Sequence, residues 1–344
     1  MQKIPKLQKG DQVALLSPSW GGPHEFPHVY ELGKKRLEEV FGFVVKEYPS
    51  TLATPEQLKR SPEMRAKDIQ DAFSDPNIKA IISTIGGEDS VRVLPFLDFD
   101  ELIKHPKVLL GYSDTSTLLS SLNILGLVTF HGPSVMAGFA EPNELPGDFV
   151  EHINSFFFEN WDSYSYQPFQ SWSEELLLWS DPTNLEKRRK FHSNSPWRIL
   201  QGKGVHEGVL FGGNIEVLEF LKGTQFWPDE NFWEGRFFFL ETSEEVPSVD
   251  QVIRILRNYA SQGVFQKING LLIGRARGYS DQDKQELDSR VLEFVRNELD
   301  LPNLALVTGM DFGHTDPQWV LPLGVKAELN LDKKTFSLLE SPFL

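Results

Sequence analysis

The feature that most constrains the fold is a strict alternation of strand and helix patterns over the first 125 residues. Short apolar runs at 13–17, 43–48, 80–84 and 108–112 predict buried strands. Between and after them, residues 30–41, 62–73 and 115–125 have the apolar spacing of helices. Because strands that alternate with helices are joined by right-handed crossovers, this pattern predicts a mostly parallel sheet flanked by helices. The predicted class is α/β.

The chain divides into three parts. Residues 1–140 carry the α/β pattern, whereas residues 141–203 mix Pro, Ser, Trp and charged residues without a sustained period and predict an irregular linker or insertion. Strand and helix patterns resume in residues 204–344, and the tail at 320–339 predicts two or three short antiparallel strands. We therefore expect a second, C-terminal α/β domain with antiparallel strands, which suits a length of 344 residues.

Composition excludes several functions. The chain has no Cys, which excludes disulfides, thiolate nucleophiles, iron–sulfur clusters and zinc sites built on cysteine. A net charge of -15 disfavours nucleic acid polymers and anionic membrane surfaces as partners. No run approaches about 18 apolar residues, and the N-terminus lacks the apolar core of a secretory signal. We therefore expect a cytoplasmic protein with no membrane partner.

Reactive side chains follow three of the predicted strands. Ser113 lies at the turn between a strand and a helix in KVLLGYSDTSTLLSSL, Glu241 follows the apolar run RFFFL, and His314 lies beyond the strand predicted at 305–309. In open α/β sheets, ligands gather at the carboxyl ends of the strands. A serine, a histidine and a carboxylate are the three parts of an activated hydroxyl nucleophile. The pattern therefore predicts a Ser-His-Glu catalytic triad.

Each of these residues also has a simpler structural interpretation. Ser113 or its neighbour Asp114 would cap the following helix, and Glu241 begins the acidic run ETSEE, which is typical of a solvated loop. His131 also follows a strand and is the alternative base, although we interpret it as structural. No second histidine lies at ligand spacing from His314, so we expect no metal.

The segment STIGGEDS places two glycines after the strand predicted at 80–84. Such a pair exposes backbone N–H groups that suit a phosphate or an oxyanion. The segment is not G-x-G-x-x-G, and no P-loop lysine follows it, which disfavours a nucleotide cofactor and a nucleotide-dependent transferase. A second alternative is a non-catalytic small-molecule binding protein with a two-domain cleft, in which Ser113 only forms a hydrogen bond to the ligand.

Together, the motifs resemble the LD-carboxypeptidase family of serine peptidases, in which the microcin-immunity peptidases form a branch. The resemblance runs through KGDQVALLSPS, IGGEDS, HPKVLLGYSDTSTLL, TFHGPS, GVLFGGNIEVL, FLET and DFGHTDPQWVLPLGV. It implies the same triad, Ser113, Glu241 and His314, and an oxyanion hole formed by the backbone N–H groups of Gly87 and Asp114. It also implies a cytoplasmic, often dimeric enzyme without a metal or an organic cofactor.

The resemblance implies two substrate classes: an L,D-linked murein peptide, or an aminoacyl- or peptidyl-nucleotide of the microcin type. Trp172 and Trp179 lie in the irregular segment and are candidates for stacking on a nucleobase, or else they are core or dimer-interface residues. Arg275 follows a predicted strand and would receive a substrate carboxylate, or else form a surface salt bridge. We therefore expect a small peptide or aminoacyl-nucleotide as substrate, and a homodimer.

Overall fold

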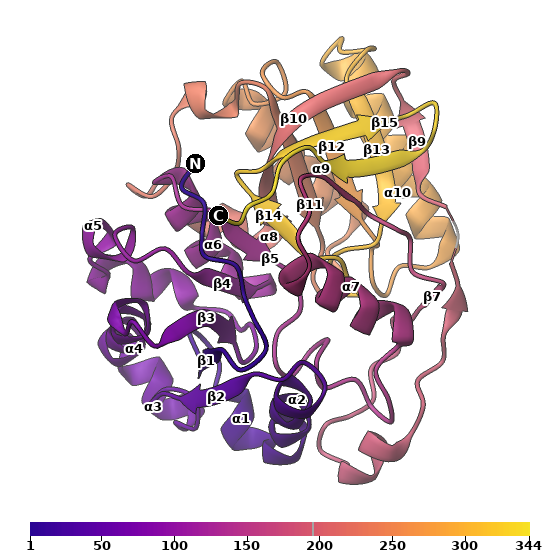
Figure 1. The fold of residues 1–344 in the computed structure, drawn as a ribbon. Coiled ribbons are helices and arrows are strands. Elements are labelled where there is room, and N and C mark those ends of the chain that lie inside the picture. Colours follow the sequence, from indigo (N-terminus) through magenta and orange to yellow (C-terminus); the bar gives the residue numbers. More distant parts are fainter. Residues whose placement is uncertain (195) are drawn as a thin grey trace.

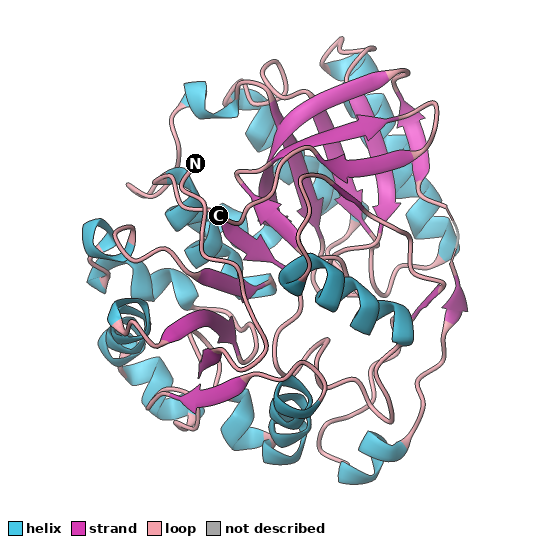
Figure 2. Ribbon diagram, viewed as in Figure 1, coloured by secondary structure: helices cyan, strands magenta, loops and turns pink. Residues whose placement is uncertain are grey.

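Two main β-sheets, of six and eight strands, organise the parts of the chain that the computed structural model describes, residues 1–194 and 196–344. Residue 195, within the predicted irregular segment, lies outside the described residues. Helices pack against both sheets, and the two sheets occupy opposite ends of the molecule (Figures 1 and 2). The predicted α/β class is confirmed.

The first sheet has the strand order β14-β5-β4-β3-β1-β2, with β1 to β5 paired in parallel and β14 antiparallel to β5. Its strands are β1 (Gln12–Leu16), β2 (Val44–Glu47), β3 (Ile78–Ser83), β4 (Val108–Gly111), β5 (Thr129–His131) and β14 (Leu321–Leu323). Its helices are α1 (Gly22–Glu25), α2 (Pro27–Glu39), α3 (Pro55–Arg60), α4 (Pro62–Ser74), α5 (Phe99–Leu102) and α6 (Ser116–Ile124).

Helix α4 shows how the sequence pattern becomes structure. It begins at Pro62, which is favourable at a first helical position because its missing N–H would have no helical partner there. Its apolar residues Ile69, Ala72 and Phe73 follow helical spacing and are all fully buried. Ser61 precedes the helix as predicted, although its side chain makes no capping hydrogen bond.

The second sheet has the strand order β6-β16-β15-β10-β11-β12-β13-β9. Its four central strands, β10 to β13, are parallel, and the strands outside them are antiparallel. The strands are β6 (Tyr164–Ser165), β9 (Arg198–Gln201), β10 (Val205–Asn214), β11 (Arg236–Glu241), β12 (Gly270–Gly274), β13 (Ala305–Met310), β15 (Lys326–Asn330) and β16 (Thr335–Leu338). The accompanying helices are α8 (Ile215–Leu218), α9 (Val249–Ser261) and α10 (Asp281–Glu293), the last continued by a π-helical turn.

The segment between the sheets has little regular structure beyond one helix. It contains α7 (Gly147–Phe158), the short pair β7 (Ser171–Trp172) and β8 (His192–Ser193), and a 3-10 turn at Pro182–Glu186. That turn lies beside α2 of the first sheet (Figure 1). The C-terminal tail then returns, because β14 joins the first sheet rather than the second. The tail does contain short antiparallel strands, but they belong to two sheets.

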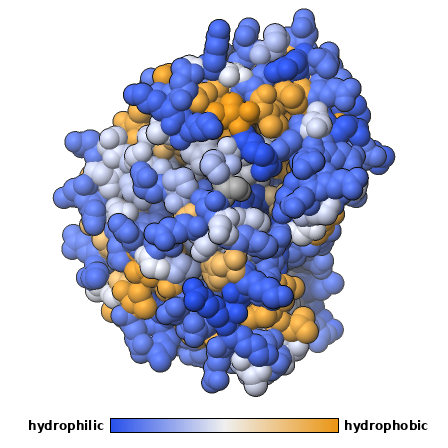
Figure 3. All heavy atoms as spheres, turned by 90° about the vertical axis from the view of Figure 1, so that its right-hand side faces the viewer, coloured by the Kyte–Doolittle hydropathy of each residue, from blue (hydrophilic) through white to orange (hydrophobic). Residues whose placement is uncertain are grey.

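The surface is largely polar on the side that faces the viewer in Figure 3. Apolar side chains gather there in separate patches. No helix among the described residues has the length and apolar character needed to cross a bilayer.

One contact joins the two sheets where the predicted reactive residues lie. The backbone N–H of Asn214, at the end of β10, donates to the Ser116 hydroxyl at the start of α6, over 3.2 Å. Since α6 follows β4, this contact holds the carboxyl end of the second sheet against the helix that follows Ser113.

Candidate active site

Ser113 occupies a strained turn between β4 and α6. It begins a 3-10 turn, and its φ is 57°, a left-handed conformation that is uncommon for residues other than glycine. A Cβ placed on Gly86 would lie 2.9 Å from the Ser113 hydroxyl oxygen. The glycine loop therefore packs closely on the serine, as expected where a nucleophile stands at a sharp strand-to-helix turn.

Glu241 and His314 meet in the interior. Glu241 is the last residue of β11, and its carboxylate Oε2 lies 2.5 Å from Nδ1 of His314. Their side chains are 0% and 5% exposed, respectively. Gly313 makes this approach possible, because a Cβ at its φ of +100° would lie 2.8 Å from the Glu241 Cβ. A buried carboxylate in this place fixes the orientation of the imidazole and stabilises its charged form.

The other nitrogen of the His314 ring faces a second carboxylate. Nε2 lies 3.1 Å from Oε2 of Glu244, a residue in the loop after β11. Burial by itself lowers the pKa of His314, but Glu241 and Glu244 outweigh that effect and raise the pKa to about 10. The hydrogen bond from His314 lowers the pKa of Glu244 to about 2. In this arrangement the ring is an imidazolium near neutral pH.

Ser113 and His314 are neighbours through Tyr112, whose ring centroid is 4.9 Å from that of His314. Within residues 1–194 and 196–344, however, no hydrogen bond links the Ser113 hydroxyl to His314. The structure thus brings together the carboxylate and the histidine of the expected triad, and leaves the link between histidine and serine unmade. The complete triad stays a prediction.

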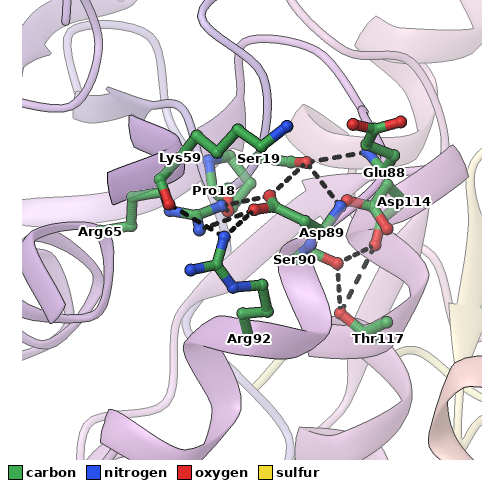
Figure 4. Close-up of polar contacts among 10 residues, drawn as sticks. All are labelled: Pro18, Ser19, Lys59, Arg65, Glu88, Asp89, Ser90, Arg92, Asp114 and Thr117. Atoms are coloured by element: carbon green, nitrogen blue, oxygen red, sulfur yellow. Dashed lines mark hydrogen bonds and ion pairs between the residues drawn. The ribbon is translucent and has the colours of Figure 1, made fainter. Parts of the chain in front are cut away.

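The glycine loop that approaches Ser113 is held by a partly buried polar network (Figure 4). Ser19 accepts hydrogen bonds from the backbone N–H groups of Glu88 and Asp89, over 3.1 and 3.3 Å. Arg65, which is fully buried, donates two hydrogen bonds to the Asp89 carboxylate, and Arg92 donates another. Because Gly87 directly precedes these residues, the network fixes one of the two N–H groups predicted for the oxyanion hole.

The second predicted N–H group belongs to Asp114, which the same network holds in place. The N–H of Ser90 donates to the Asp114 carboxylate over 2.8 Å, and the Ser90 hydroxyl donates to the Asp114 carbonyl over 2.6 Å (Figure 4). In the described part of the chain, no side-chain hydrogen bond caps the start of α6, and the Asp114 carboxylate accepts from Ser90 instead. The interpretation of these two residues as simple helix caps is therefore not supported by the geometry.

His131, the alternative base, has the surroundings of a core residue. It is fully buried, and within the described residues neither ring nitrogen has a hydrogen-bond partner. Its ring packs against Phe239 and Tyr112, with centroids 5.4 and 6.1 Å away. Burial lowers the pKa of His131 to about 4, so the ring is neutral at physiological pH.

The two candidate tryptophans lie in different pockets. Trp179 lines a pocket that also includes Tyr112 and Arg277, and its ring stacks on Trp20 at a centroid distance of 6.3 Å. Trp172 lines another pocket, in which the Arg275 guanidinium lies 5.2 Å from its ring. Of the two, Trp179 is the one that shares a pocket with Tyr112, the residue that precedes Ser113.

Arg275 is engaged inside the protein. Its side chain is 6% exposed and forms an ion pair with the Asp311 carboxylate. The predicted role for Arg275, reception of a substrate carboxylate, would require that pair to open or a second anion to join it. Arg277 is partly exposed in the pocket of Trp179 and is the arginine placed nearer Tyr112.

Two features of the site were missed from the sequence. One is the contact of Glu244 with His314; the sequence suggested only that Glu244 does not directly follow an apolar strand. The other is Arg189, which forms ion pairs with Glu141 and, over 2.9 Å, with Asp316. The pair with Asp316 fastens the irregular segment to the loop that carries His314, and the pair with Glu141 joins two parts of the segment itself. No local sequence pattern signals them, since the partners lie 48 and 127 residues away.

Known proteins share this fold and much of this sequence. A family model described as the LD-carboxypeptidase N-terminal domain matches residues 13–132, and one described as the C-terminal domain matches residues 207–329. The microcin C7 self-immunity protein MccF of Escherichia coli is 30% identical over 278 residues, 80% of this chain and 78% of that protein. The murein tetrapeptide carboxypeptidase of Pseudomonas aeruginosa is 35% identical over 164 residues, 47% of this chain and 45% of that protein.

Solved structures agree over nearly the whole chain. MccF in complex with glutamyl sulfamoyl guanosine has a TM-score of 0.87 at 28% identity, covering 99% of each chain. An MccF-like protein from Streptococcus pneumoniae in complex with AMP has a TM-score of 0.84 at 29% identity, covering 96% of this chain and 98% of that one.

Fold, site and relatives together define a hydrolase of the serine-type carboxypeptidase class. Within that class, the chain belongs to the LD-carboxypeptidase family.

Proposed function

We propose that this protein cleaves a C-terminal amide bond through an acyl-enzyme formed on Ser113, with His314 as the base and Glu241 as its orienting carboxylate. The observation that carries the proposal is the 2.5 Å contact between Glu241 and His314, buried beside the strained turn of Ser113. A carboxylate on Nδ1 leaves Nε2 as the nitrogen that exchanges protons with the serine.

The chemistry follows from these positions. With His314 neutral, Nε2 takes the proton of the Ser113 hydroxyl as its oxygen bonds to the amide carbon. The backbone N–H groups of Gly87 and Asp114 stabilise the oxyanion. The C–N bond then breaks, and His314 returns the proton to the leaving amine. Water then attacks the ester carbon and gives its proton to His314. As the bond from that carbon to the Ser113 oxygen breaks, His314 returns the proton to the serine, which releases the acid and restores both residues.

Two substrate classes fit the proposal: an L,D-linked murein tetrapeptide, which loses its terminal residue, and an aminoacyl- or peptidyl-nucleotide of the microcin type. The names of the relatives include both kinds of ligand. The position of Trp179 in the pocket that Tyr112 also lines favours the nucleotide class, because an indole ring there offers a stacking surface for a base.

The test offers the purified protein an L,D-tetrapeptide and an aspartyl sulfamoyl adenosine side by side. We expect hydrolysis of at least one, and we expect Ser113→Ala to lose it by about 10⁴–10⁶-fold while it keeps the same thermal unfolding midpoint within a few degrees. A fluorophosphonate should label Ser113 in the native protein. Absence of both hydrolysis and labelling would instead support a non-catalytic binding protein.

A further inference from the structure

The position of Glu244 conflicts with the chemistry proposed for His314. Nε2 of His314 must face Ser113 when it accepts the proton, yet in this structure it faces the Glu244 carboxylate at 3.1 Å. Glu244 must therefore leave the ring before the serine attacks.

Two hydrogen bonds, one on each side of Glu244, hold the loop that carries it. Ser243, the residue before Glu244, donates its hydroxyl to the Glu216 carboxylate on α8 over 2.5 Å. Three residues after Glu244, the Pro247 carbonyl accepts a hydrogen bond from the buried Tyr279 hydroxyl. The loop is fixed at both ends, so the Glu244 carboxylate stays at the mouth of the site, where its side chain is 55% exposed.

Charge balance indicates what the carboxylate contacts after it leaves the ring. Among the described groups, His314 in its charged form contacts two carboxylates, Glu241 and Glu244. When His314 becomes neutral to act as a base, both carboxylates lose that cation. Arg277 is near enough to lower the pKa of Glu244, but it forms no ion pair with it in the described part of the chain. A cation on the substrate would restore the balance.

We infer that Glu244 is a specificity-determining residue that binds an ammonium group on the residue supplying the scissile carbonyl, and that this exchange frees His314. The inference rests on the proposed function and narrows its substrates to amides whose acyl residue is cationic. Both substrate classes allow this chemistry: an aminoacyl-nucleotide carries an α-ammonium beside the carbonyl, and a murein tetrapeptide with lysine at its third position carries one on that side chain.

The experiment compares substrates that differ only in this charge. One pair is aspartyl sulfamoyl adenosine and its N-acetyl form; the other is the lysine-containing tetrapeptide and the form with that lysine acetylated. kcat and KM are measured for the native enzyme, Glu244→Gln and Glu245→Gln. Glu245 is the matched control, because it is the next residue of the same loop, is exposed and, among the described residues, forms no ion pair with His314.

We expect the native enzyme and Glu245→Gln to prefer the ammonium form of the substrate they cleave, and Glu244→Gln to lose about tenfold or more of that preference. An unchanged preference in Glu244→Gln would overturn the inference and leave the proposed function standing.

The same pairs are titrated by calorimetry against Ser113→Ala with and without Glu244→Gln. If the native enzyme cleaves nothing but the second substitution still removes the preference in binding, the proposed function fails and the assignment of Glu244 stands; if that preference is also unaffected, both fail.

Discussion

Nδ1 of His314 and Oε2 of Glu241 lie 2.5 Å apart although 73 residues separate them in the sequence. The two residues come from the carboxyl ends of β13 and β11, which are separated in the sheet by β12 alone. Parallel strands place their carboxyl ends at one edge, so the sheet itself brings the base and its carboxylate together.

The first prediction concerns that contact. In Glu241→Gln the neutral amide cannot stabilise the imidazolium or hold the same ring tautomer, so we expect kcat to fall by about 10⁴-fold. Loss of the carboxylate should also lower the pKa of His314, because burial would then act against only one remaining negative charge. The measurements are NMR titration of the ring and kcat with whichever of the two proposed substrates the native enzyme cleaves. An unchanged kcat would remove Glu241 from the mechanism.

The second prediction concerns pH. Because Glu241 and Glu244 raise the pKa of His314 to about 10, the ring is protonated and inactive as a base at lower pH. We therefore expect kcat/KM, which reports the free enzyme, to rise with pH through neutrality. Glu244→Gln removes one of the two charges, so the rising limb should move to lower pH.

The shift of the rising limb reports His314 and not its titratable neighbours. Tyr112 packs against it, and burial raises the pKa of that phenol well above its ordinary value, while His131 is neutral. Neither titrates in the range of the shift. The pH profiles are measured with a substrate whose ammonium is trimethylated, so that its positive charge does not titrate in that range. Coincident rising limbs for the native enzyme and Glu244→Gln would contradict the prediction.

The third prediction concerns the glycine loop. Gly87 has a φ of +148°, and a Cβ there would lie 2.2 Å from the Ser19 hydroxyl oxygen that holds the loop. In Gly87→Ala the loop must shift, and we expect kcat to fall by about 10²–10³-fold, the loss typical of one oxyanion donor. Gly147→Ala is the control, because a Cβ at Gly147 meets no atom within 4 Å. If KM rises while kcat stays unchanged, the loop binds substrate without stabilising the oxyanion.

The first sheet was predictable because its information is local. Apolar runs of four to six residues and helical spacing determine each element, and the rule for crossovers orders them. Strand β14 was not predictable as part of that sheet, since Leu321 pairs with His131 across 190 residues of chain and no local pattern encodes that pairing. The predicted domain boundaries, cytoplasmic location and homodimer stay predictions.

In the candidate site, too, the residues that a local pattern marks were predictable and the contacts between distant residues were not. Strand-end position identified Glu241 and His314, because the end of a parallel strand is a place that the local pattern defines. The contact of Glu244 was not predictable, because the path of its loop depends on anchors such as Glu216 and Tyr279, which lie 28 and 35 positions away in the sequence. The fastening of the irregular segment by Arg189 depends on distant partners in the same way.

The last prediction separates the two tryptophans. Trp179 shares its pocket with Tyr112 and stacks on Trp20, whereas Trp172 packs against Arg275 and His192 in another pocket. Stacking contributes about 1–3 kcal/mol per base, so Trp179→Ala should raise KM for aspartyl sulfamoyl adenosine by about 5–150-fold. Trp172→Ala, which also removes a half-buried indole of the irregular segment, is the matched control and should leave that KM within about twofold.

The tetrapeptide has no base, so its KM should respond equally little to both variants. Equal losses for the nucleotide in Trp179→Ala and Trp172→Ala would mean that the segment acts as a structural unit, because a stacking contact at one ring affects only the variant that removes that ring.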